Sequence, residues 1–244
     1  STIPNIQSGY GIAITPDGQR LYVAPAGGSF VYTVDTTTYA TATIGVGNYP
    51  IAVAVSPDGA RAYVTALIGN NLTVIDNATA TAIATIPMGS TPHGVTVSPD
   101  SARVYVANSN SNSVSVIDAN TLGVIATVPV GAQPRGIDVS PNSTRVYVAN
   151  QGDANVSVID AGNNTVIGVI ALGSGVGMYS MGDFMVLGGV APSFTSALPG
   201  SGAYGAPYSH MLSASGTPAP SFALQSGALP AGLSLNHATG VISG

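Results

Sequence analysis

One segment of about forty residues occurs four times in succession along the chain. Its clearest copy runs from Ser98 to Asp118 and contains a Ser-Pro-Asp turn, the hexapeptide Arg-Val-Tyr-Val-Ala-Asn and the tripeptide Val-Ile-Asp. Three positions mark the period, at steps of 41, 42 and 42 residues: Pro16, Pro57, Pro99 and Pro141; Arg20, Arg61, Arg103 and Arg145; and Asp35, Asp76, Asp118 and Asp160. A fixed period of about 20 to 50 residues indicates a repeat architecture in which each copy is one supersecondary unit. The repeat therefore constrains the fold more than any local propensity does.

Composition favours β-structure and excludes several classes of function. The 244 residues include five basic residues, all Arg, ten acidic residues, all Asp, and no Cys. The chain thus lacks Lys and Glu, two strong helix formers, and is rich in residues that favour strands and turns. A formal net charge of −5 without a basic cluster argues against nucleic-acid binding. The absence of Cys excludes disulfides, thiolate metal sites and cysteine nucleophiles within this chain, and we expect no cofactor.

Each repeat divides into four predicted strands. In the third repeat these are residues 94–98, 103–107, 113–117 and 122–130, separated by clusters of turn-forming residues. The second strand is apolar on both faces, and the first alternates bulky with small side chains, so neighbouring sheets are expected to stack face to face. The longest apolar stretch, residues 166–182, is rich in Gly and Ser and starts in the repeat register, so it predicts a strand and no membrane span.

Four antiparallel strands per unit, repeated at this period, predict an all-β fold, namely a β-propeller with the first strand of each blade innermost. The four full blades are expected at about 10–46, 51–88, 93–130 and 135–172. Residues 1–5 align with the end of a repeat, and 178–181 with the start of another. We therefore expect the chain to be a piece of a longer one, with its blades part of a larger ring. The alternative is a closed four-bladed ring.

The repeats resemble the YVTN-type β-propeller repeat found in surface-layer and secreted proteins. Arg-Val-Tyr-Val-Ala-Asn at 103–108 and 145–150, Arg-Ala-Tyr-Val-Thr-Ala at 61–66 and Arg-Leu-Tyr-Val-Ala-Pro at 20–25 carry this resemblance, which covers a propeller at about 1–187. Propellers of this family commonly have seven blades, so the resemblance implies that the four blades are part of a seven-bladed ring. Such propellers also resemble seven-bladed lactonases and the propellers of periplasmic oxidoreductases. The composition then changes, and residues 188–244 resemble a partial Ig-like (cadherin-like) module, with Gly-Ala-Leu-Pro-Ala-Gly-Leu-Ser-Leu at 227–235 and Thr-Gly-Val-Ile-Ser-Gly at 239–244.

The charged residues that recur in every repeat are best interpreted as structural. An Asp before a turn accepts hydrogen bonds from backbone N–H groups, and one Arg per blade can pair with that Asp or cover a blade edge. Positions that differ between otherwise similar repeats are better candidates for a ligand site. The residue before the first strand is Tyr10, Ile51, His93 and Arg135 in successive units, and Asp138 stands where other units have Ala or Thr.

In a propeller these variable positions surround one mouth of the central channel, so Tyr10, His93, Arg135 and Asp138 are the candidate binding residues. The competing interpretation is that mouth residues are exposed and vary freely. With a single His in the propeller, no catalytic triad and no metal site can be identified.

Two functional hypotheses remain. The first is a non-catalytic cell-surface or secreted scaffold that displays propeller loops for adhesion, with a protein or carbohydrate ligand as partner. The second is a lactonase-type hydrolase with polar groups and a divalent metal at the channel mouth. A periplasmic redox partner is a third interpretation, without a supporting haem or metal motif. The first hypothesis places the protein outside the cell or on its surface, with the periplasm as the alternative.

Overall fold

The protein is described by a computed structural model that covers residues 9–25, 27–172, 193–194, 208–215, 229–230, 232–236, 239 and 241–243. The expected partial units at residues 1–5 and 178–181 lie outside these residues. The chain divides into two compact units, Ser1–Met185 and Val186–Gly244. In the described part no helix is long and apolar enough to cross a membrane.

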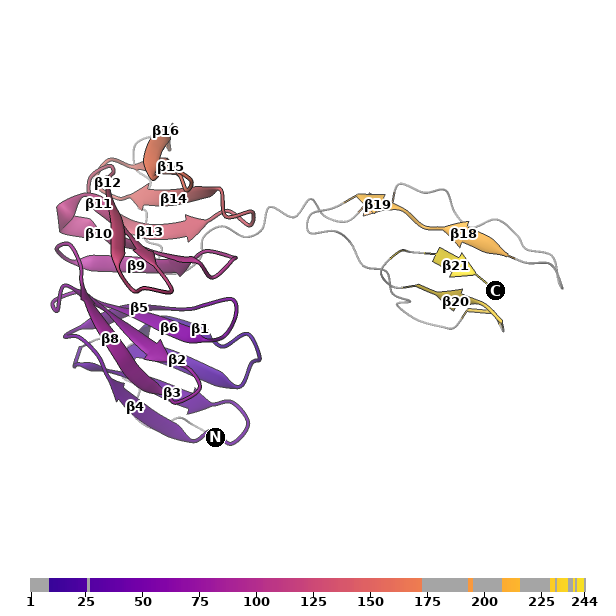
Figure 1. The fold of residues 1–244 in the computed structure, drawn as a ribbon, viewed down its shortest axis with the longest axis horizontal. Helices are drawn as coiled ribbons and strands as arrows, with labels where there is room; N and C mark the ends of the chain where they lie inside the picture. Colours follow the sequence, from indigo (N-terminus) through magenta and orange to yellow (C-terminus); the bar gives the residue numbers. More distant parts are fainter. Residues whose placement is uncertain are drawn as a thin grey trace. The chain divides into compact units, whose positions relative to one another are not determined.

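The first unit contains four sheets, each of four antiparallel strands joined in sequence order (Figure 1). The first blade comprises β1 (Gly9–Ile14), β2 (Arg20–Pro25), β3 (Phe30–Asp35) and β4 (Thr41–Gly45), and the second β5 (Pro50–Val55), β6 (Arg61–Ala66), β7 (Asn71–Asp76) and β8 (Thr81–Pro87). The third comprises β9 (Pro92–Val97), β10 (Arg103–Asn108), β11 (Ser113–Asp118) and β12 (Val124–Pro129). The fourth comprises β13 (Pro134–Val139), β14 (Arg145–Asn150), β15 (Asn155–Asp160) and β16 (Thr165–Ala171). The predicted all-β propeller fold is confirmed.

The first strand of each blade is the innermost, since β1, β5, β9 and β13 pack side by side in that order. Their approach requires small residues. A Cβ atom added to Gly11 would lie 2.8 Å from the carbonyl oxygen of Ile51, and one added to Gly94 would lie 2.3 Å from that of Arg135. Glycine at these two positions therefore allows the backbones of neighbouring blades to meet beside the channel.

Turn chemistry fixes the ends of the strands. Ser98 donates its hydroxyl to Asp100 at 2.5 Å, and Asp100 accepts the backbone N–H of Ala102, which closes the turn between β9 and β10. Asp118 accepts hydrogen bonds from the backbone N–H groups of Asn120 and Thr121, which hold these residues in a turn. The outer strand therefore begins at Val124 and not at residue 122 as expected. The predicted turn role of the repeated Asp is thus confirmed.

The hydrophobic core of the propeller lies between the blades. Three clusters of buried side chains each join two consecutive blades, such as Tyr105 and Val128 of the third with Ile137 and Ile159 of the fourth. Since apolar burial is the main favourable term in folding, each blade is stabilised mostly by its neighbours.

The second unit contains two small described sheets. In one, β17 (Ser193–Phe194) pairs with β19 (Ala214–Ser215). In the other, β21 (Val241–Ser243) lies between β18 (Ser209–Met211) and β20 (Ser234–Leu235). Both sheets are antiparallel, as an Ig-like sandwich requires.

Candidate functional site

Three of the four candidate residues, Tyr10, His93 and Arg135, lie at the start of inner strands, on the rim that carries the loops between blades, whereas Asp138 lies near the other end of its strand. Tyr10 belongs to β1, His93 to β9, and Arg135 and Asp138 to β13. His93 and Asp138 are buried, Arg135 is half-buried and Tyr10 is exposed. These residues are therefore placed at different depths in the inner wall of the propeller.

His93 and Arg135 are brought together, because β9 and β13 are neighbours and Arg135 acts electrostatically on the imidazole. Burial, and then the charge of Arg135, lower the pKa of His93 from 6.5 to about 4. The ring is thus neutral at pH 7. Its Nδ1 atom is buried and has no hydrogen-bond partner among the described residues. A neutral imidazole in this state can exchange a hydrogen bond with a bound molecule.

Tyr10 is paired with a residue that sequence reasoning missed. Its ring centroid lies 6.3 Å from that of Tyr49, with the planes inclined by 40°. A side-chain hydrogen bond between Tyr49 and Tyr10 raises the pKa of Tyr49. Tyr49 has a positive φ of 62° and lies in the loop before β5, which belongs to the same rim. The equivalent loop positions in the next blades hold Thr91 and Gln133. This difference between repeats was the signal that could have identified Tyr49 from the sequence.

Asp138 lies three residues beyond Arg135 along β13. Its carboxylate accepts the backbone N–H of Val139 at 2.8 Å. The described residues contain no group of three or more His or Asp side chains that could hold a metal ion.

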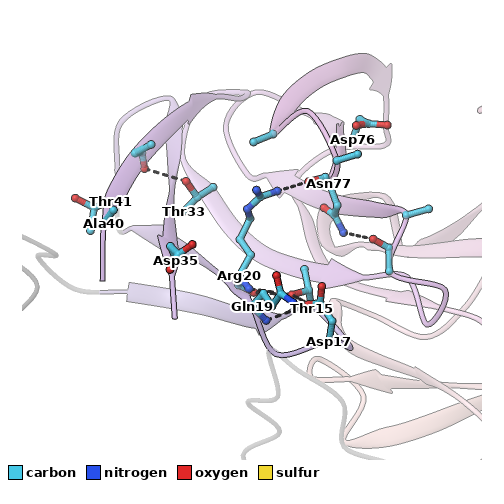
Figure 2. A pocket seen from close by; sticks show the side chains of 15 residues that line it. Thr15, Asp17, Gln19, Arg20, Thr33, Asp35, Ala40, Thr41, Asp76 and Asn77 are labelled. Carbon is cyan, nitrogen blue, oxygen red and sulfur yellow. Dashed lines mark hydrogen bonds between the residues drawn. The ribbon is translucent and has the colours of Figure 1, made fainter. Parts of the chain in front are cut away.

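A groove of about 610 Å³ lies between the first and second blades, at the opposite end of the inner strands (Figure 2). None of the four candidate residues lines this groove. Figure 2 shows Arg20 reaching across it to donate a hydrogen bond to the carbonyl oxygen of Asn77. The hydroxyl group of Tyr22 donates a hydrogen bond to the side-chain oxygen of Asn77 at 2.8 Å. The groove therefore follows the contact between two blades.

The carboxylates of this groove are already engaged in turns. Hydrogen bonds from Thr15 and Gln19 lower the pKa of Asp17, and those from Thr38 lower the pKa of Asp35. Asp76 is held in the same way by Thr79. A smaller groove of about 400 Å³ occurs at the equivalent place between the third and fourth blades. This recurrence assigns both grooves to the architecture of the repeat.

The sequence left two roles open for the repeated Arg, a pair with the Asp of its own blade or cover of a blade edge, and three of the four Arg residues donate hydrogen bonds to the following blade. Arg61 donates to the carbonyl of Ala119 and Arg103 to that of Ala161, each in the following blade.

Comparison with known proteins agrees with this architecture. The family model described as "Lactonase, 7-bladed beta-propeller" matches residues 12–167, and that described as "Putative Ig domain" matches residues 191–244. The comparison with curated proteins finds no match.

Several solved structures share the propeller fold. A hydrazine synthase from Kuenenia stuttgartiensis is similar over 69% of this chain and 50% of its own, with 28% identity and a TM-score of 0.64. A putative 6-phosphogluconolactonase from Bacteroides uniformis is similar over 65% of this chain and 52% of its own, with 16% identity and a TM-score of 0.58. A functionally unknown protein from Desulfotomaculum acetoxidans is similar over 70% of this chain and 60% of its own, with 19% identity and a TM-score of 0.60.

This chain spans half to three-fifths of the length of these solved chains. The two structures of lower identity share the fold alone. The lactonase family model, in contrast, matches residues 12–167, which is well over half of this chain. The protein therefore belongs to the lactonase family of 7-bladed β-propellers.

Proposed function

We propose that the protein is a non-catalytic interaction scaffold, secreted or held at the cell surface, that binds a protein or carbohydrate ligand at the mouth of its propeller. In this proposal the repeats are of the YVTN type. The observation that carries it is the separation of two kinds of polar residue. Those that recur between blades hold turns and blade contacts, whereas three of those that differ, Tyr10, His93 and Arg135, lie on one rim.

The chemistry of this rim suits reversible binding. The exposed Tyr10 and its neighbour Tyr49 offer an apolar ring surface with hydroxyl groups at its edge. Arg135 supplies a permanent positive charge, and the neutral imidazole of His93 has an unused buried nitrogen. A net charge of −5 continues to argue against nucleic acid as the partner.

The Ig-like unit supports the same function. Residues 191–244 match the Ig family model, and the strands described within them pair antiparallel. Modules of this kind commonly space binding domains along extracellular chains, which supports an adhesive role outside the cell.

A second candidate function is lactone hydrolysis, favoured by the match of the lactonase model to residues 12–167. In this reaction water adds to the ring carbonyl, the ring C–O bond breaks, and a hydroxy acid forms. His93 would accept a proton from the attacking water, and Arg135 would stabilise the negative charge on the carbonyl oxygen. A pKa of about 4 makes His93 a weak base, which is why binding is our first proposal.

One pair of assays separates these functions. The full chain is applied to a printed glycan array and, separately, to 6-phosphogluconolactone with acid release as the readout. We expect glycan binding without lactone turnover. His93→Ala and Arg135→Ala should each weaken binding by about 1–3 kcal/mol, as central interface residues do.

Asn120→Ala is the matched control, since Asn120 is exposed on the opposite rim and should leave binding unchanged. Turnover that the His93 variant abolishes would establish the hydrolase instead. Binding that is equal in wild type and both mouth variants would remove the mouth as the site.

A further inference from the structure

Five Asn residues of the propeller stand in the acceptor motif for N-linked glycans, which is Asn-x-Ser/Thr with x other than Pro. They are Asn71, Asn77, Asn142, Asn155 and Asn163. In a chain rich in Asn, Ser and Thr this short motif also arises by chance, so the sequence alone does not choose among the five. The structure does, because a glycan is bulky and needs an acceptor amide at the surface.

Asn77 is built into the contact between the first and second blades. Its side chain is 8% exposed. It accepts a hydrogen bond from the hydroxyl of Tyr22 and donates one to the carbonyl oxygen of Gly59, both at 2.8 Å. A glycan on its nitrogen would remove the second bond and separate the blades.

Asn71 and Asn155 begin the third strands of their blades, β7 and β15, and both are half-buried. The hydroxyl residues of their motifs, Thr73 and Ser157, are 1% and 2% exposed. An enzyme that reads the whole motif cannot reach these hydroxyl groups in the folded protein.

Asn142 and Asn163 lie in turns and are exposed. Oδ1 of Asn142 accepts hydrogen bonds from the hydroxyl of Thr144 at 2.7 Å and from its backbone N–H at 3.2 Å. Oδ1 of Asn163 accepts the same two bonds from Thr165, at 2.6 and 3.2 Å. Within the described part of the chain, neither Nδ2 atom donates a hydrogen bond. Each motif therefore presents its amide nitrogen and its hydroxyl group together at the surface.

The exposure of these two turns is a property of every repeat. The residues at the position of Asn142 in the other blades are Asp17, Asp58 and Asp100, and those at the position of Asn163 are Thr38, Thr79 and Thr121; all six are exposed. The second and third blades have neighbours on both sides, so the exposure does not depend on where the chain begins or ends. The fourth blade differs from the others in carrying Asn at both positions.

The two turns are also neighbours. The backbone N–H of Ala161 donates to the carbonyl oxygen of Thr144 at 3.0 Å, which ties one turn to the other. Both turns follow the ends of their strands, β13 and β15, whereas Arg135 of the mouth lies at the start of β13. Glycans at these turns would cover the rim opposite the mouth and leave the mouth open.

We propose that Asn142 and Asn163 are N-glycosylation sites. In the reaction, Nδ2 attacks the anomeric carbon of an oligosaccharide carried on a lipid diphosphate. The N–C bond forms as the C–O bond to the diphosphate breaks, the lipid diphosphate leaves with the electron pair, and one Nδ2 proton passes to a base of the transferase. Glycosylation in the cell rests on the proposed location outside the cytoplasm, because this motif is modified in secreted chains.

Transfer to the folded full chain in vitro tests the proposal independently of that location. Chain made in a host without N-glycosylation is incubated with a lipid-linked oligosaccharide and a single-subunit oligosaccharyltransferase that accepts synthetic peptides of all five motifs. Peptide N-glycosidase then converts each occupied Asn to Asp, and mass spectrometry locates the change. We expect glycans at Asn142 and Asn163 and none at the other three motifs. Two empty turns, or equal occupancy of the three motifs within the fold, would overturn the proposal. Ligand binding at the mouth is measured separately, so either result can fail without the other.

Substitutions that exchange residues between repeats give matched controls. Asn142→Asp places at this turn the residue of the other three blades, so thermal unfolding should be unchanged while one glycan is lost. The reverse change, Asp100→Asn together with Ala102→Thr, builds the motif into the equivalent turn of the third blade and should add one glycan. An Asn142→Asp chain that still carries two glycans, or a double variant that gains none, would show that these turns do not make the acceptor and would overturn the proposal.

Discussion

The guanidinium of Arg61 in the second blade donates a hydrogen bond to the main-chain carbonyl of Ala119, 58 residues ahead in the third blade. Arg20 and Arg103 make the equivalent bond at the other two blade contacts. A positive charge from each blade is thus anchored in the next. Because repeat proteins are stabilised largely by contacts between neighbours, this bond should contribute to the stability of the whole arc.

Removal of the bond should destabilise the propeller. We expect Arg61→Ala to lower the free energy of unfolding by about 1–2 kcal/mol, because a partly buried carbonyl loses a charged donor. Arg145→Ala is the matched control and should cost less than about 0.5 kcal/mol, the range of substitutions that remove no defined contact. Urea titration of both variants, compared with the wild type, measures the difference. Equal costs would show that the bond between blades contributes nothing.

The tyrosine of the second strand should show the same dependence on a neighbouring blade. Tyr105 is buried between the third and fourth blades, and we expect Tyr105→Ala to cost about 3–5 kcal/mol. Tyr147 has the same place in the fourth blade but is half-buried, so Tyr147→Ala should cost clearly less. Denaturant unfolding of the two variants gives the comparison. A larger cost at Tyr147 would contradict the link between the burial of each tyrosine and its contribution to stability.

His93 should make stability depend on pH. Its pKa in the folded protein, about 4, lies below the ordinary value of 6.5, so between these values the unfolded chain binds a proton that the folded chain does not. Stability is therefore fully present above pH 6.5 and is lost as pH falls toward 4, by at most about 3 kcal/mol.

His93→Gln should flatten the pH profile, and His210→Gln, in the second unit, should leave it unchanged. Unfolding by urea at several pH values between 7.5 and 4 measures both. The Asp residues of the turns do not interfere, since their lowered pKa values reduce stability only below about their ordinary 3.8. A profile with the same slope in the His93 variant would refute the role of this residue.

The close approach of the inner strands can be tested by replacing a glycine on one of them with alanine. Gly94→Ala would bring Cβ against the carbonyl oxygen of Arg135, so the strands must separate, at a cost of about 1–3 kcal/mol. Gly168, on the outer strand β16, has no atom within 4 Å of an added Cβ. Gly168→Ala should therefore be neutral or stabilise by up to about 1 kcal/mol. In thermal unfolding, the midpoint temperature should fall for Gly94→Ala and should stay the same or rise for Gly168→Ala.

Much of the fold follows from the repeat. Because Pro57, Arg61 and Asp76 recur at fixed steps, the strands between them can be placed from the amino-acid sequence alone. The turn role of Asp118 follows from its position before a turn. These predictions succeed because they depend on local backbone chemistry, which each repeat contains in full.

Contacts between repeats were harder to predict. The sequence places Arg61 opposite Asp76 on paired strands, and it gives no sign that the guanidinium turns away to a carbonyl in the next blade. The burial of His93 was missed for a similar reason, since it arises from the approach of three inner strands. The partnership of Tyr10 with Tyr49 depends on the path of a loop. Such features belong to the assembled sheets and not to any one of them.

The acceptor of each Arg bond has a consequence for how this protein can change. The residues at the acceptor position are Asn77, Ala119 and Ala161, which differ in polarity and size, yet each offers the same backbone oxygen. A substitution there can alter the side chain without deleting the oxygen. The junctions are therefore mutationally robust on the acceptor side and fragile on the donor side. As the repeats diverge, the arginine is the residue that each junction must retain.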